Sequence, residues 1–152
     1  MTLTFDLPKS LILMPVPVCR EDGSRAFTIQ GLPNGSIELF GEEGQQLGSI
    51  TTRRWISLGP DLPIGQVACT KNFQVEWYQI HYFHFWTAEK LPRENSYRVS
   101  IRQGEPIGTI RRQRIRLCKF RYTLETQDPR YFLMMVMLSL AIAMRRRPRA
   151  LD

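Results

Sequence analysis

The arginines of the segment RRQRIRLCKFRY, residues 111–122, are the side chains of this sequence best suited to binding chemistry. Alternate residues of a β-strand share a face, so Arg112, Arg114 and Arg116 would form a row about 7 Å apart in succession, which resembles the spacing of phosphates. Arginine favours planar, two-pronged contacts with phosphate or carboxylate groups. The row therefore predicts an anion-binding surface, and the alternative interpretation is a solvated outer strand face.

Further arginines extend this candidate site. Arg111 adjoins the row, and Arg145, Arg146 and Arg147 form a second basic cluster near the end of the printed sequence. We expect these residues to assist the row in binding phosphorylated head groups. Alternatively, the second cluster only faces the carbonyl end of a preceding helix, where positive charge is favourable.

The row lies in a segment, residues 111–124, that has the pattern of one long strand or of a strand pair. In an unbroken strand, the apolar and aromatic residues at 118, 120, 122 and 124 would share the face of the row. Burying arginines on such a face is unfavourable. We therefore expect a bulge, or an end to burial, near Leu117 and Cys118.

No sequence pattern predicts catalysis, a metal site or a cofactor. His81 and His84 are three residues apart, which places them on opposite faces of a strand, so they do not easily share a metal ion. The sequence has no G-x-S-x-G, H-E-x-x-H or Walker motif. The sequence leaves open a catalytic Cys–His or Ser–His pair that only folding would bring together. We expect a protein that is not an enzyme and that binds neither a metal nor a cofactor.

Charge and cysteine content narrow the class of protein. The net charge is +7, and residues 91–152 hold 14 basic against 5 acidic residues, whereas residues 1–90 hold 7 against 9. The basic half is a candidate anion-facing side. Three cysteines without C-x-x-C spacing favour a reducing compartment, and prolines break the one apolar run near the N-terminus, Leu11 to Met14. These features predict a cytoplasmic protein, peripheral to a membrane if it binds lipid.

A buried helix is expected from Tyr131 to Met144, because this stretch is apolar on every side. It would be about 21 Å long, too short to cross a hydrocarbon core of roughly 30 Å. Asp128 and Pro129 are suited to cap and begin it. Since the rest of the chain has strand patterns, we expect one domain, residues 1–152, with residues 145–152 as a basic tail.

The strands show a repeated hairpin pattern. Gly44–Ile50 and Gly104–Ile110 share the form G-x-x-φ-G-x-I, and an alternating stretch precedes each of them. Each copy predicts a β-hairpin whose second glycine, inside the return strand, marks a bulge or a close approach of the backbone. Many strands and one apolar helix predict a mainly β fold, an antiparallel closed barrel that encloses the helix.

Three features together resemble one known family: these hairpins, the sequence Phe120-Arg-Tyr-Thr-Leu-Glu, and the sequence Asp128-Pro-Arg ahead of the apolar helix. The family is the tubby C-terminal-like superfamily, which includes LURP-one-related proteins and phospholipid scramblases. The resemblance covers roughly residues 25–144. It implies an antiparallel barrel of about twelve strands around the C-terminal helix. Tubby proteins bind phosphoinositide head groups through basic surface residues, although no position-by-position match to that site is present here.

Three functions compete at this point. The charge distribution and the resemblance favour a module that binds anionic phospholipid or phosphoinositide-type head groups at a membrane surface. A protein-interaction or regulatory scaffold without a small ligand is the alternative, and exposed tryptophans among Trp55, Trp77 and Trp86 would favour it. Nucleic-acid binding ranks third, because no recognition motif is present. The sequence leaves the oligomeric state open and predicts no transmembrane span.

Overall fold

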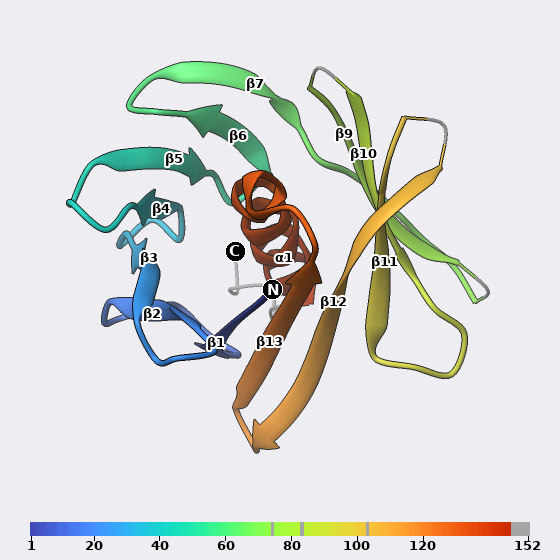
Figure 1. The fold of residues 1–152 in the computed structure, drawn as a ribbon, viewed down its shortest axis with the longest axis horizontal. Coiled ribbons are helices and arrows are strands. Elements are labelled where there is room, and N and C mark those ends of the chain that lie inside the picture. The colour runs from blue at the N-terminus through green and yellow to red at the C-terminus, as the bar shows by residue number, and fades with distance from the viewer. Residues whose placement is uncertain (74, 83, 103, 147–152) are drawn as a thin grey trace.

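The computed structural model describes residues 1–73, 75–82, 84–102 and 104–146. Within them the chain forms one antiparallel sheet of 13 strands, which curves into a nearly closed barrel around the C-terminal helix α1 (Figure 1). The expected mainly β barrel of about twelve antiparallel strands, enclosing one hydrophobic helix, is therefore confirmed.

The strands are short and are joined mostly by tight turns. Their bounds are β1 Thr2–Pro8, β2 Val16–Arg20, β3 Arg25–Gly31, β4 Ile37–Phe40, β5 Gln46–Ile50, β6 Trp55–Leu58, β7 Leu62–Gln66, β8 Ala68–Lys71, β9 Glu76–Tyr82, β10 His84–Lys90, β11 Ser96–Ile101, β12 Glu105–Arg116 and β13 Lys119–Thr126. Their order in the sheet is β7-β6-β5-β4-β3-β2-β1-β13-β12-β11-β10-β9-β8. The first and last strands are thus central neighbours, which brings together residues from opposite ends of the chain.

The barrel closes where β7 continues into β8. Only Val67, which is fully buried, separates the two strands, and β7 pairs with β6 whereas β8 pairs with β9. One continuous stretch of backbone therefore reaches both ends of the sheet. Closure of this kind reduces the number of exposed, unpaired strand edges.

Helix α1 spans Phe132–Arg146, close to the predicted helix at 131–144. A 3-10 turn, Pro129–Tyr131, leads into it, and the Asp128 carboxylate accepts a hydrogen bond of 3.0 Å from the amide two residues later. This is how a capping residue satisfies an amide that has no partner within the helix. The predicted start of the helix is therefore confirmed.

The barrel wall covers the apolar surface of α1. All eight side chains from Met135 to Ile142 are fully buried. Ser139, the polar residue among them, donates its hydroxyl to the carbonyl oxygen of Met135 at 2.7 Å, so its burial leaves no unmet donor. Among the helices of the described residues, none has the length and apolar character that a membrane crossing needs.

Two glycines lie where α1 meets the barrel wall. A Cβ atom at Gly108 would come within 2.2 Å of the carbonyl oxygen of Glu125 and 3.0 Å of the Cε atom of Met135. A Cβ atom at Gly48 would come within 2.5 Å of the Cε atom of Met137. These are the second glycines of the repeated hairpin pattern, and the predicted close approach at both positions is confirmed.

We expect Gly108→Ala to destabilise the protein by about 1–3 kcal/mol, because the added methyl group meets a backbone oxygen that moves only if the sheet distorts. Urea unfolding followed by tryptophan fluorescence measures the change. Gln113→Ala, at an exposed position of the same strand, is the control and should stay within about 0.5 kcal/mol of wild type. An unchanged midpoint for Gly108→Ala would show looser packing between β12 and α1.

Candidate anion-binding site

The two ends of the barrel differ in charge. Because neighbouring strands are antiparallel, successive turns alternate between the end where α1 begins and the end where it finishes. The turns at the first end carry six acidic residues, Glu21, Asp22, Glu42, Glu43, Asp61 and Asp128, and two basic ones, Arg102 and Arg130. The second end, which we call the basic end, comprises the described residues of the turns at 9–15, 32–36, 51–54, 72–73 with 75, 91–95 and 117–118. Its charged turn residues are Lys9, Arg53, Arg54, Arg93 and Glu94.

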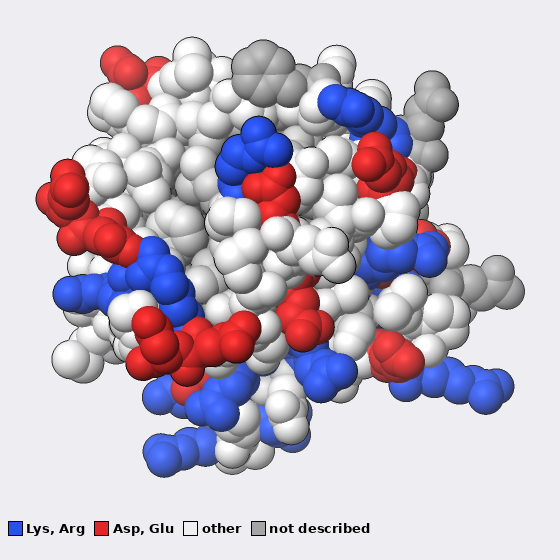
Figure 2. All heavy atoms as spheres, in the orientation of Figure 1, with Lys and Arg blue, Asp and Glu red and all other residues white. Residues whose placement is uncertain are grey.

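This separation of charge agrees with the direction of the helix. The peptide dipoles of an α-helix leave partial positive charge at its N-terminus and partial negative charge at its C-terminus. In this barrel the acidic turns surround the start of α1, and the basic turns surround its end. Basic side chains gather along the lower edge of the face in Figure 2, where Figure 1 places the turn between β12 and β13.

Arg112 lies on the inner face of β12 at the basic end. Its guanidinium carbon lies 3.6 Å from the centroid of the Phe120 ring, and its Nε donates a hydrogen bond of 3.0 Å to the Tyr122 hydroxyl. The side chain is half-buried. The face of an aromatic ring attracts a cation, and this attraction offsets part of the loss of water around the guanidinium group. The planar group is thereby held in one orientation.

Arg114 and Arg116 continue from Arg112 toward the turn. The guanidinium carbon of Arg114 lies 5.8 Å from the centroid of the same Phe120 ring, so Arg112 and Arg114 flank one aromatic side chain. Arg116 is exposed and pairs with Lys119 across the hairpin, after a shift in register between Arg114 and Arg116. The structure therefore brings Arg112 and Arg114 together around Phe120 and places Arg116 at the tip.

The sequence left open one strand or a strand pair at 111–124, and the structure has the pair. The chain reverses at Leu117 and Cys118, so the segment is a hairpin of β12 and β13. The expected interruption near these residues does occur, as a turn. Arg114 pairs with Phe120 as a consequence, and Arg112 and Arg114 do share the inner face with the aromatic residues. Their position at the open end of the barrel, where the guanidinium groups reach solvent, makes this arrangement possible.

The other predicted site residues are dispersed. Arg111 is exposed on the outer face of β12, where it pairs with Ser96, and it does not join the cluster around Phe120. Arg145 is exposed in the last turn of α1, at the basic end, and Arg146 is the final residue of that helix. Arg147 lies outside the described residues.

Two lysines that the sequence did not predict belong to the basic end. Lys9 lines a small cavity together with Arg112 and Ala143 of α1. Its amide donates a hydrogen bond of 2.8 Å to the carbonyl oxygen of Cys118, which ties it to the hairpin that carries Lys119. No local pattern marks either lysine, because the pairing of β1 with β13 brings them together across most of the chain.

Ion pairing distinguishes Arg112, Arg114 and Arg116 from Arg121 on the neighbouring strand. Arg121, on the outer face of β13, binds the Asp6 carboxylate through Nε at 2.9 Å and NH2 at 3.1 Å, and these hydrogen bonds raise the pKa of Arg121. Within the described residues, Arg112, Arg114 and Arg116 have no carboxylate in ion-pair contact. Their charge is thus available to an external anion.

The histidines and cysteines form no comparable site. His81 stacks on Phe85, with ring centroids 5.0 Å apart, and His84 accepts a hydrogen bond of 3.3 Å from Nε of Arg102. In the part of the chain that the structure describes, no three potential metal ligands lie close enough to hold an ion. The three cysteines are free thiols.

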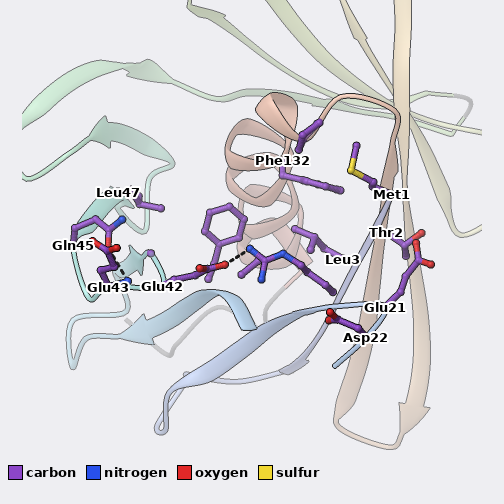
Figure 3. Close-up of a pocket in the computed structure, with 15 residues that line it drawn as sticks. Met1, Thr2, Leu3, Glu21, Asp22, Glu42, Glu43, Gln45, Leu47 and Phe132 are labelled. Atoms are coloured by element: carbon purple, nitrogen blue, oxygen red, sulfur yellow. Dashed lines mark hydrogen bonds and ion pairs between the residues drawn. The ribbon is translucent and has the colours of Figure 1, made fainter. Parts of the chain in front are cut away.

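A larger cavity of about 600 Å³ opens at the opposite end of the barrel (Figure 3). Leu3, Phe27 and Phe132 give it apolar walls, and Phe132 belongs to the start of α1. On its rim, Arg20 forms an ion pair with Glu42. The rim is otherwise mainly acidic, so this cavity does not suit an anion, and the basic end remains the candidate site.

Comparison with known proteins provides no function to transfer to this chain. No protein-family model, no curated protein and no solved structure matches it. Three observations bear on function: two arginines lie around Phe120 with no carboxylate partner in the described residues, the barrel end that carries them is basic, and the fold positions them.

Proposed function

We propose that this barrel is a non-enzymatic module that binds anionic phospholipid head groups, including phosphoinositide-type ones, at its basic end. The observation that carries the proposal is the pair Arg112 and Arg114 around Phe120, without carboxylate partners in the described residues. A phosphate offers several oxygens to a guanidinium fork, and such charge-assisted hydrogen bonds are stronger than neutral ones. Lys9, Lys119 and Arg145 add positive charge at the same end.

We also propose that the chain is related to the tubby C-terminal-like superfamily. The antiparallel barrel around a C-terminal helix is the architecture that the resemblance implies, which supports the relationship. The proposed location is the cytoplasmic surface of a membrane, with peripheral attachment. Three free thiols suit a reducing compartment, and the cytoplasmic leaflet carries the anionic lipids that a basic surface attracts.

A protein-interaction scaffold is the second candidate function. The observation that favours it is Trp55, which is 51% exposed at the basic end, whereas Trp86 is buried. Exposed tryptophans are enriched among the residues that dominate protein interfaces. Nucleic acid is the third candidate, since the same arginines would attract its phosphates. Within the described residues, however, no helix is placed to enter a groove, because α1 is buried inside the barrel.

A binding panel with the wild-type protein tests these three functions. We expect it to sediment with vesicles of phosphatidylcholine mixed with phosphatidylserine at about 50 mM salt, and to be released progressively as salt screens the attraction. Vesicles of phosphatidylcholine alone should bind little protein. Failure to sediment with the anionic vesicles at low salt would overturn the lipid proposal, and tighter binding to an oligonucleotide would favour nucleic acid. Binding to neither the anionic vesicles nor the oligonucleotide would favour the protein-interaction scaffold.

A further inference from the structure

Exposed apolar side chains gather at the basic end of the barrel. Ten large apolar side chains of the described residues are exposed, and seven lie at this end: Leu11, Leu13, Met14, Trp55, Phe73, Val75 and Leu117. Leu13 is 84% exposed, Leu117 80% and Met14 75%. Single exposed apolar residues are ordinary on a protein surface, whereas a group of them within a polar rim marks an interaction surface.

The loop between β1 and β2, residues 9–15, is fixed at its centre. Ile12 is buried, and its carbonyl oxygen lies so close to Gly31 that a Cβ atom there would come within 2.2 Å of it. Ile12 therefore covers the end of the core, and its neighbours Leu11 and Leu13 remain in solvent. The apolar run of this loop supplies one core residue, and its other members are exposed.

This loop and the turn between β12 and β13 form one surface. A backbone hydrogen bond of 2.8 Å from the Lys9 amide to the Cys118 carbonyl joins them. Leu13 and Met14 line a hollow of about 660 Å³ together with Lys119, the first residue of β13. Apolar and basic side chains are thus interleaved across the loop and the hairpin turn.

We propose that Leu13, Met14 and Leu117, which we call the apolar tip, insert into the boundary between the head groups and acyl chains of an anionic bilayer. The inference rests on the proposed function. It adds that the basic end of the barrel faces the bilayer, and that apolar contact contributes to binding in a way that salt does not screen. Cations surround the tip, and a negatively charged bilayer is complementary to them. Long cationic side chains keep their charge among the head groups while apolar neighbours leave water.

The variant that tests insertion is Leu13→Ser combined with Leu117→Ser. It should bind anionic vesicles about tenfold more weakly than wild type at low and at high salt alike, because salt does not screen the lost apolar contact. Leu62→Ser is the matched control, because Leu62 is 57% exposed at the opposite end of the barrel, and it should bind like wild type. All these side chains are exposed, so the melting temperature should change little.

A second measurement uses Cys118, which is exposed beside Leu117. An environment-sensitive fluorophore on this thiol, in a protein with Cys19→Ser and Cys69→Ser, should shift its emission to the blue when anionic vesicles are added. Lipids brominated on their acyl chains should quench it. The same label on Asp61→Cys, with Cys118→Ser added, reports the opposite end and should respond to neither.

The outcomes separate the two proposals. If the wild-type protein does not sediment with anionic vesicles even at low salt, the proposed function and the insertion both fail. If it does sediment, but the double serine variant matches wild type at high salt or the Cys118 label stays in water, insertion alone is wrong and binding is electrostatic. Weaker binding at high salt together with the blue shift would support the inference.

Discussion

Leu138→Asp should destabilise the protein by several kcal/mol, a large fraction of the total stability of a typical domain. Leu138 is fully buried in α1, in the middle of the eight buried residues that the barrel wall covers. A carboxylate there would lose its water and meet only apolar neighbours. Urea unfolding, followed by the fluorescence of the buried Trp86 and by circular dichroism, measures the loss of stability.

The control for this substitution is the same change at an exposed leucine. Leu117→Asp lies in the turn between β12 and β13, where the side chain is 80% exposed, and it should alter stability by no more than about 0.5 kcal/mol. If Leu138→Asp changed the free energy of unfolding by less than about 1 kcal/mol, α1 would not be enclosed by the barrel, and the fold described above would be wrong.

Arg114→Glu should weaken binding to anionic vesicles by about tenfold or more at low salt, because it removes one charge-assisted contact to phosphate and adds a repulsive charge. Arg114 is exposed, and it shares the Phe120 ring with Arg112, so the change reaches the centre of the candidate site without disturbing the core. The melting temperature should stay close to that of wild type. Vesicle sedimentation at several salt concentrations measures the effect.

Arg111→Glu is the matched control, since it makes the same change of charge on the same strand but on the outer face. We expect it to weaken vesicle binding by only about two- to threefold, through the altered net charge of the basic end. Equal losses for the two variants would mean that binding depends on overall charge. In that case the geometry around Phe120 would have no special role.

The resemblance to a family of barrels was informative about the fold but not about the site. It implied the enclosed helix, and the apolar pattern at 131–144 predicted that helix independently, because a helix without a polar face requires a covering structure. The glycines at 48 and 108 were also identified from the sequence, since a glycine inside a strand usually marks a close backbone approach. Each of these features is encoded in residues that lie near one another along the chain.

By itself the sequence determined the buried helix, the hairpins with their glycines and the excess of arginine in the second half of the chain, since spacing and composition are local properties. Only the tertiary structure decided which arginines lie together. No Gly, Pro or Asn marks the turn at Leu117 and Cys118, so the sequence left open whether the chain reverses there, and the pairing of Arg114 with Phe120 was not predicted. The pairing of β1 with β13 likewise joined the loop at 9–15 to that turn, because contacts between distant segments depend on the register of the closed sheet.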